Sequence, residues 1–514
     1  MKKLSLLAIG LLSMSTIYAQ DITDALRYSQ DEVMGSARFR GLSGAFGALG
    51  GDMSAVSINP AGSAVFSQSH AALSFVSADK NNKATYFGNT QKTNDSKFDL
   101  SQGGASFVFR NNNNNSPWRK FTLGVAYDRT NDHNDSWYAA GINTADDGQF
   151  SNSIASYFYD YADGRRLDQI SASSNESISG AYARINSQYG FAYQQAFLGF
   201  ESFILEPDDL TDDANTTYTA NINTGNFEHR YTNIETGYNG KISFNFATQY
   251  EDNLYIGVNL NSHFIDYQRT TSLLEDNNNG GLITSIDFDN SLSTTGNGFS
   301  LQVGGILKVT PEFRVGLTYS SPTWYTIKEE TTQFLDTSEL LNQNIDALNP
   351  NVINVYPEYR LQTPAKYTGS LAYIFGRSGL ISFDYSNKNY GNTKFKIGKG
   401  FNDPQTETEY AYLTGDMSNE LTSASTYRLG GEYKVNQISF RGGYRYEESP
   451  YANGVTVGDL NGFSLGLGYN FGNTKLDVTF DQAKRSYQST IHNLGLVDID
   501  NKNSNLTLSL SFNI

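Results

Sequence analysis

The chain of 514 residues contains no cysteine, and only 18% of its residues are charged. Without cysteine the protein can form no disulfide, no thiolate metal site and no cysteine nucleophile, and it cannot carry a lipid on an N-terminal cysteine. A soluble enzyme of this size usually carries more charge. Beyond the N-terminus there is no run of 18 or more apolar residues, which excludes a helical membrane protein.

Basic residues are also scarce. The 37 lysines and arginines stand against 53 acidic residues, a formal net charge of -16 that argues against a nucleic-acid partner because phosphates would be repelled. Aromatic residues and glycine are abundant, with 34 Tyr, 32 Phe and 47 Gly, and a disordered chain would have far fewer aromatics. These numbers favour a β-rich chain whose apolar residues are spread thinly and regularly.

The first nineteen residues read as a signal peptide. Lys2 and Lys3 form a positive start, residues 4–12 an apolar stretch, and Ala19 a small residue before a cut ahead of Gln20. Ile17 stands where a small residue is usual, which leaves the exact cleavage position open. Export without cysteine or a spanning helix fits the periplasm or outer membrane of a Gram-negative cell.

Period-2 alternation predicts β-strands with one apolar face and one small or polar face. The last strand shows it most clearly, since leucines at 506, 508 and 510 alternate with Thr507, Ser509 and Ser511. Strands of about 10 residues with this pattern are typical of a transmembrane β-barrel. The pattern predicts fourteen strands: 66–77, 98–109, 119–128, 241–250, 254–268, 298–309, 313–321, 365–375, 380–389, 426–435, 438–446, 462–471, 474–482 and 504–514.

The connections between these strands alternate in length. Tight links at 251–253, 310–312, 376–379, 436–437 and 472–473 are separated by long ones, such as 78–97, 129–240, 269–297 and 483–503. Only 110–118 is intermediate. Outer-membrane barrels have short periplasmic turns and long extracellular loops. The alternation therefore predicts an all-β antiparallel barrel with both termini in the periplasm.

Residues 35–62 do not fit a barrel wall, because they are dense in Gly, Ala and Ser without sustained alternation. Glycine permits close backbone approach, so we expect this segment to plug the lumen. It ends in Asn59, Pro60, Ala61 and Gly62, just before the first predicted strand. Asn-Pro is also a common turn initiator, and bracing the plug is an alternative role for the element.

This element resembles the hatch of the FadL/TodX family of outer-membrane transport proteins. Residues 316–322, 363–367, 440–446 with Ser449-Pro450, and 465–469 are similar to that family's barrel in order and spacing. The resemblance implies a hatch over residues 20–65 and a fourteen-stranded barrel over 66–514. It also implies passive uptake of hydrophobic small molecules such as long-chain fatty acids, with sideways release through a gap in the wall. Gly103, Gly104 and Gly124 are candidate positions for that gap.

The long segment 129–240 contains five apolar residues close to helical spacing: Phe191, Phe197, Phe200, Phe203 and Ile204. They are a candidate groove that captures apolar ligands. A small core of the loop explains them equally well, because an outward loop needs packing of its own.

One pair of charges is placed by register. A two-residue turn at Asn436-Gln437 pairs Val435 with Ile438, and the continuing ladder sets Glu432 opposite Arg441 on the lumen face. We interpret the pair as an ion pair that braces the wall, contributing roughly 0.2–1 kcal/mol. Exchanging the two charges should then preserve folding. The alternative is that Arg441 binds an anionic head group.

No catalytic, cofactor or metal site is predicted. Residues 462–466 match G-x-S-x-G, but that motif needs a strand, a turn and a helix, whereas Ser464 lies inside an alternating strand. The five histidines form no cluster, and Asp498, Asp500, Asn501 and Asn503 read as a solvated turn without the Gly and Glu of an EF-hand loop. An outer-membrane lipid hydrolase would need an outward Ser/His pair that no strand clearly presents.

The expected partners are a hydrophobic small-molecule ligand and outer-membrane lipid, and the expected state is a monomer. A secretion-accessory or structural outer-membrane barrel that binds a protein partner is the alternative function, which the long acidic loops permit. A general aqueous porin is less consistent with a filled lumen.

The barrel prediction has a direct test. The purified protein should be rich in β-structure in detergent and should change its migration on gels when heated, because a closed barrel resists unfolding until boiled. A monomer that is soluble in water without detergent would contradict the barrel.

Overall fold

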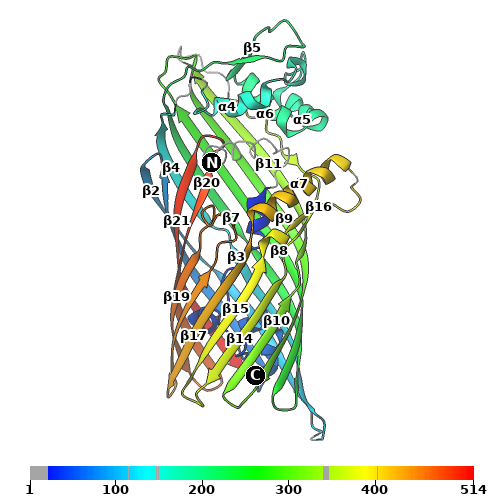
Figure 1. Ribbon diagram of the computed structural model, residues 1–514, viewed down its shortest axis with the longest axis vertical. Coiled ribbons are helices and arrows are strands. Elements are labelled where there is room, and N and C mark those ends of the chain that lie inside the picture. Colours follow the sequence, from blue (N-terminus) through cyan, green and yellow to red (C-terminus); the bar gives the residue numbers. More distant parts are fainter. Residues whose placement is uncertain (1–20, 114, 146–147, 149, 340–346, 402) are drawn as a thin grey trace.

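In the computed structural model, residues 21–113, 115–145, 148, 150–339, 347–401 and 403–514 are described. The predicted signal peptide lies outside them. Within the described part of the chain, a closed barrel of 14 antiparallel strands is formed (Figure 1). The last strand pairs with the first, with Leu510 opposite Leu73, so no open edge remains where the sheet closes.

The barrel strands range from 8 residues in β10 to 26 in β9. Their bounds are β1 His70–Tyr86, β2 Asn89–Arg110, β3 Trp118–Asp132, β7 Phe227–Tyr250, β8 Leu254–Asp276, β9 Ile283–Lys308, β10 Phe313–Ser320, β14 Lys366–Ile374, β15 Gly379–Asn389, β17 Ser423–Val435, β18 Ile438–Glu447, β19 Leu460–Asn470, β20 Thr474–Thr490 and β21 Leu496–Asn513. Further strands extend or border the wall: β4 Asp135–Asn143, β11 Trp324–Glu339, β12 Asn354–Val355, β13 Tyr359–Gln362 and β16 Lys394–Ile397.

All fourteen predicted strands are confirmed, but several predicted long loops are wrong. The segment 78–97 continues β1 and β2 to a turn at Phe87 and Gly88, both with positive φ. Only 277–282 separates β8 from β9, and only 491–495 separates β20 from β21. In these extensions the outward side chains are largely polar, so the ladder continues after the apolar alternation has stopped. β1 also starts at His70 rather than at residue 66.

The predicted segments correspond to a belt of outward apolar side chains. Phe244, Leu465 and Leu508 are 55%, 60% and 47% exposed on the outer face. An apolar surface that encircles a barrel is stable when lipid covers it. The alternation in the sequence therefore marks the part of each strand that lies in the membrane.

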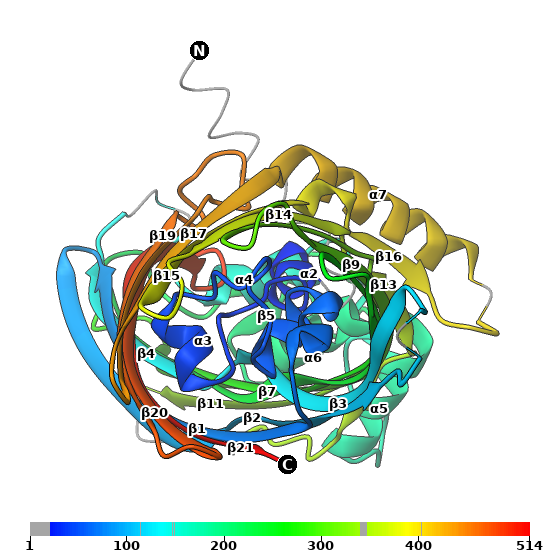
Figure 2. The same cartoon turned by 90° about the horizontal axis from the view of Figure 1, so that it is seen from below.

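The N-terminal segment lies inside this ring, as Figure 2 shows for α2 and α3. It consists of α2 Ile22–Arg27, α3 Ala37–Gly41 and the 3-10 helices η2 Ser54–Ser57 and η3 Pro60–Val65. Side chains at the helix starts hold these short turns, because Asp21, Ser36 and Asn59 each accept a backbone N–H. Both termini were predicted at the end with the short turns. The C-terminus lies there (Figure 1), whereas Asp21, the first described residue, lines a cavity in the lumen.

A small domain covers the opposite end of the barrel (Figure 1). It contains α4 Ala155–Ala162, η4 Leu167–Gln169, α5 Ile178–Tyr189, α6 Phe191–Glu201, β5 Leu205–Pro207 and β6 Tyr218–Ala220. We call it the cap. η5 Tyr390–Asn392 and α7 Pro404–Glu420 connect β15 and β16 to β17. Among the described residues, no helix has the length and apolar character needed to cross a membrane.

Glycines on the inner face of β8 and β9 let the N-terminal segment approach the wall. A Cβ at Gly304 would overlap Asn59 Oδ1, and one at Gly257 would overlap the Pro60 carbonyl group. The neighbouring Gly305 faces outward, where the nearest atom to an added Cβ would be the Tyr255 carbonyl oxygen at 3.6 Å.

Substituting Gly304 with Val should displace the N-terminal segment from the wall, because the new side chain needs the space of Asn59. We expect higher ion conductance in planar bilayers. Gly305→Val is the matched control, since it changes the adjacent residue on the lipid side and should leave conductance unchanged. Equal conductance for both variants would show that the contact at Asn59 does not hold the segment in place.

Candidate functional site

The element Asn59-Pro60-Ala61-Gly62 is buried and hydrogen-bonded on several sides. Asn59 Nδ2 donates to the carbonyl oxygens of Gly47 at 2.7 Å and Gly305 at 3.0 Å, and Asn59 Oδ1 accepts from Ala61 N at 3.1 Å. Asn245 of β7 donates to the Pro60 carbonyl oxygen at 2.9 Å. One asparagine thus joins two parts of the N-terminal segment to the barrel wall.

The predicted register of β17 and β18 is observed, with Glu432 opposite Arg441. Arg441 Nε donates to Glu432 Oε2 at 2.6 Å, and Arg441 Nη1 donates to Asp477 Oδ1 at 2.6 Å. The N-terminal segment adds a contact that the register could not predict. Arg38 of α3 donates to both carboxylate oxygens of Glu432, at 2.9 and 3.2 Å. The pair is therefore part of a network between wall and segment.

This network is buried, with Glu432 and Arg441 only 3% and 8% exposed. A second buried pair stands beside it, in which Arg40 donates to both carboxylate oxygens of Asp481 at 2.7 and 2.9 Å. Removing one partner of a buried pair leaves an uncompensated charge and costs about 3–5 kcal/mol. The pair thus does more than brace the wall, because it also holds α3.

A cavity of about 570 Å³ lies between α2 and the cap. Its floor includes Leu26 and Arg27 of α2, and Phe191 of α6 lines its cap side. Aromatic rings form much of the wall: Trp137, Tyr231, Tyr356, Tyr451, Tyr487 and His492. Amides and hydroxyls such as Asn233, Asn290, Thr331 and Gln488 lie between them. We call this space the upper cavity.

The two arginines of the upper cavity differ in their partners. Arg27 forms an ion pair with Asp24 and lies over the Tyr267 ring, 4.2 Å from its centroid. Burial raises the pKa of the Asp24 carboxyl to about 6, against the opposing effect of Arg27. Arg269 makes no hydrogen bond or ion pair with any described residue.

His492 lines the same cavity. Burial lowers the pKa of its ring to about 4, so the ring is neutral near pH 7.

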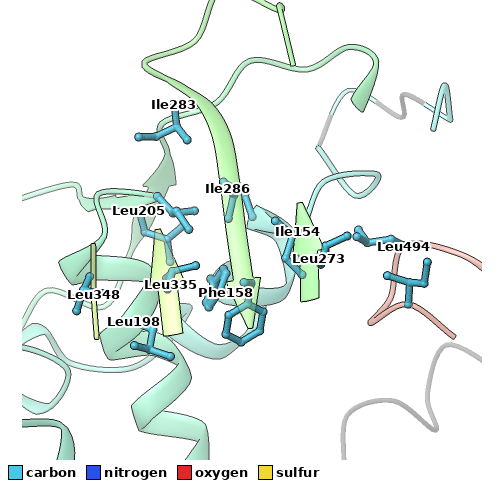
Figure 3. Close-up of a cluster of buried hydrophobic side chains, with 14 of the residues drawn as sticks. Ile154, Phe158, Leu198, Leu205, Leu273, Ile283, Ile286, Leu335, Leu348 and Leu494 are labelled. Atoms are coloured by element: carbon cyan, nitrogen blue, oxygen red, sulfur yellow. The ribbon is translucent and has the colours of Figure 1, made fainter. Parts of the chain in front are cut away.

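The five predicted groove residues do not gather on one surface. Phe197 and Ile204 are fully buried in the core of the cap, and Phe200 packs against that core. Phe203 is 50% exposed, and only Phe191 lines the upper cavity. Figure 3 shows the core around Phe158, Leu198 and Ile286. Most of the cavity lining comes from strand extensions, where polar outward residues hide the alternation in the sequence.

The wall at the three candidate gap glycines is continuous. The β2–β3 ladder runs from Gln102 opposite Asp128 to Arg110 opposite Lys120, and Gly104 packs against Met53 of the N-terminal segment. From Gln102 toward the cap, residues 89–101 of β2 pair with β1 alone, and β4 pairs with β7 alone. A seam without ladder hydrogen bonds therefore separates β2 from β4 among the described residues.

The other singled-out residues have structural contacts. Ser464 lies within β19, where its hydroxyl donates to the Gly41 carbonyl oxygen at 3.0 Å and lies 2.9 Å from Ser43 Oγ. Asp498 and Asp500 lie in β21 rather than in a turn, and they accept from Gln488 and Ser486. In the described ranges no group of three or more His, Asp or Glu side chains is placed to hold a metal ion.

The comparisons with known proteins decide the family. Residues 211–513 match the model of the family described as outer membrane protein transport protein (OMPP1/FadL/TodX). The chain belongs to this family. Its members are transport proteins of the outer membrane, not enzymes.

One solved structure with a TM-score above 0.5 has a similar fold. A FadL homologue of Pseudomonas aeruginosa has 12% identity and a TM-score of 0.54, over 94% of this chain and 99% of that one. The toluene transporter TodX of Pseudomonas putida has 11% identity and a TM-score of 0.48, over 95% and 99%. The toluene transporter TbuX of Ralstonia pickettii has 14% identity and a TM-score of 0.44, over 92% and 98%. No curated protein sequence matches the chain.

The network around Glu432 changes the expected result of a charge exchange. In a Glu432→Arg, Arg441→Glu double variant, the new arginine faces Arg38 and the new glutamate faces Asp477. We therefore expect lower thermal stability of the barrel, measured as the temperature at which gel migration changes. The control exchanges Arg166 and Asp168, an exposed pair in the cap at 2.7 Å, and should have little effect. If the Glu432 double variant is as stable as the wild type, the contact of Arg38 with Glu432 does not contribute to the thermal stability of the barrel.

Proposed function

We propose that this protein takes up hydrophobic small molecules across the outer membrane by passive diffusion, with long-chain fatty acids as the substrate class. The upper cavity is the observation that carries the proposal. It combines apolar and aromatic side chains with Arg269, which makes no ion pair or hydrogen bond with a described residue, although the carboxylates of Asp24 and Glu235 act on it electrostatically. Membership of the transport family and the printed substrate of two structural relatives, toluene, support a hydrophobic cargo.

The energetics suit an amphipathic molecule. An acyl chain gains about 0.8 kcal/mol for each CH₂ group removed from water. A hydrogen bond between the carboxylate and Arg269 adds about 1.5–3 kcal/mol, as is usual for charged groups. No energy source is needed, because the substrate moves down its concentration gradient.

Residues 20–65 act as the hatch in this proposal, and Asn59, Pro60, Ala61 and Gly62 anchor it to the wall. The contacts between hatch and wall include many polar ones, so water can replace them when the hatch shifts.

We also propose that the protein acts as a monomer surrounded by outer-membrane lipid. The barrel closes on itself, and an apolar belt covers its outer face. Neither feature requires a second copy of the chain.

Uptake of two labelled substrates tests the proposal. In cells that depend on this protein, Arg269→Gln should lower uptake of a C16 fatty acid at low concentration about tenfold or more, since 1.4 kcal/mol is a factor of 10. Uptake of toluene, which has no charge, should stay unchanged. Arg230→Gln is the control, because Arg230 lies on the outer face of β7 and is 40% exposed.

The outcomes separate the parts of the proposal. If wild-type cells take up neither substrate, the hydrophobic cargo is wrong. If both arginine variants take up the fatty acid like the wild type, Arg269 does not bind the head group.

A further inference from the structure

A second cavity lies deeper in the lumen, beside the hatch, and its lining is strongly charged. It has a volume of about 160 Å³ and is lined by seven basic and four acidic residues, in a chain whose net charge is -16. Hatch residues Asp31, Glu32 and Arg40 form one side, and β15, β17, β18, β20 and β21 supply most of the other.

Three of the basic residues are paired at short distance or share a carboxylate. Arg40 is held by Asp481 at 2.7 Å. Lys366 and Lys388 lie 3.0 and 3.7 Å from Asp31. The arginines at 428, 445 and 485 and the exposed Lys484 remain, and we call the space in front of the three arginines the arginine cavity.

The three arginines are poorly neutralised by the protein. Arg428 and Arg445 are direct cross-strand neighbours on the lumen face, an arrangement that is destabilising for like charges. Arg445 and Arg485 share Glu447 as an ion-pair partner, at the long distances of 3.9 and 3.5 Å. Arg428 makes no ion pair or hydrogen bond with a described residue.

Several polar atoms of this cluster are buried without a hydrogen-bond partner among the described residues. They are Arg428 Nε, Arg445 Nη1, Arg485 Nε and Glu447 Oε1. A buried polar atom without a hydrogen bond costs roughly 1–3 kcal/mol, so such atoms usually bind water or an ion. Glu32 also faces the cavity and Glu448 lies at its edge, where Glu448 accepts from Ser425 N.

We propose that the arginine cavity binds a small soluble oxyanion, of the phosphate or polycarboxylate class. One guanidinium group can donate two parallel hydrogen bonds to two oxygens of such an anion. An anion between Arg428 and Arg445 would also relieve the repulsion between the two side chains. A space near 150 Å³ holds a molecule of about the size of benzene, which accommodates phosphate but not a long acyl chain. This site is separate from the upper cavity and does not depend on the proposed uptake of fatty acids.

Because the hatch forms one side of the site, the bound anion would hold hatch and wall together. Thermal stability in detergent measures this effect. Inorganic phosphate should raise the temperature at which gel migration changes, relative to sodium chloride of equal ionic strength. Isothermal titration calorimetry with inorganic phosphate should show about one site per chain.

Arg428→Gln removes one of the two repelling charges. In that variant we expect phosphate affinity to fall at least tenfold and the stabilisation by phosphate to disappear, while stability without phosphate is equal to or above that of the wild type. A merely structural arginine would instead lower the basal stability. Arg445→Gln should also lose phosphate binding, and Arg377→Gln, in the exposed turn after β14, is the control that keeps it.

The source of the oxyanion is tested with phosphatidic acid in the same detergent, which should give no stabilisation because its acyl chains do not fit the lumen site. Stabilisation by phosphatidic acid alone would assign the site to a lipid head group and overturn the proposal. Absence of phosphate binding by the wild type, or equal binding by Arg428→Gln, would overturn it as well.

Discussion

The structure depends on one constraint: every backbone amide in the membrane must find its hydrogen-bond partner within the protein. A closed ring of strands meets this requirement, and the pairing of β21 with β1 completes it. Once the ring is closed, successive side chains must alternate between lipid and lumen. Leu506, Leu508 and Leu510 therefore face outward, while Thr507 and Ser509 are buried inside. The inner face must then be filled by polar groups, water or another part of the chain.

The hatch fills part of the lumen and makes two kinds of contact there. Its own apolar residues, including Phe39, Leu42 and Phe46, form a small cluster near Ala372 and Leu380 of the wall. Hydrogen bonds and ion pairs make other connections to the barrel, such as those of Asn59 and Arg38. Polar contacts can be exchanged for contacts with water at modest cost, whereas an apolar core cannot. Both polar and apolar contacts therefore hold the segment against the wall.

The lumen contains two environments with different chemistry. Above the hatch, aromatic rings and amides surround a cavity with one directly unpaired arginine, Arg269. Beside the hatch, three arginines lie around a much smaller space, and two of them, Arg445 and Arg485, share Glu447. The first suits an amphipathic molecule and the second a small anion. Their separation by the hatch segment Arg27–Arg40 means that a change at one cavity can reach the other through the position of the hatch.

The membrane part of the barrel could be predicted from the amino-acid sequence. Apolar alternation marked all fourteen strands because lipid imposes it on every second residue, and the two-residue turn at Asn436 set Glu432 opposite Arg441. Local patterns also identified the small-residue segment that enters the lumen. These features depend only on neighbours along the chain or across one turn.

Only the tertiary structure decided what meets inside the ring. The contact of Arg38 with Glu432 joins residues 394 positions apart, and no local pattern indicates it. The strand extensions above the membrane escaped detection because water faces their outer side, so apolar alternation is lost while the ladder persists. The same loss hid most of the upper cavity, and helical spacing in 191–204 could not separate Phe197 in the cap core from Phe191 at the cavity. Lumen contacts depend on closure of the barrel, which brings distant strands together around the hatch.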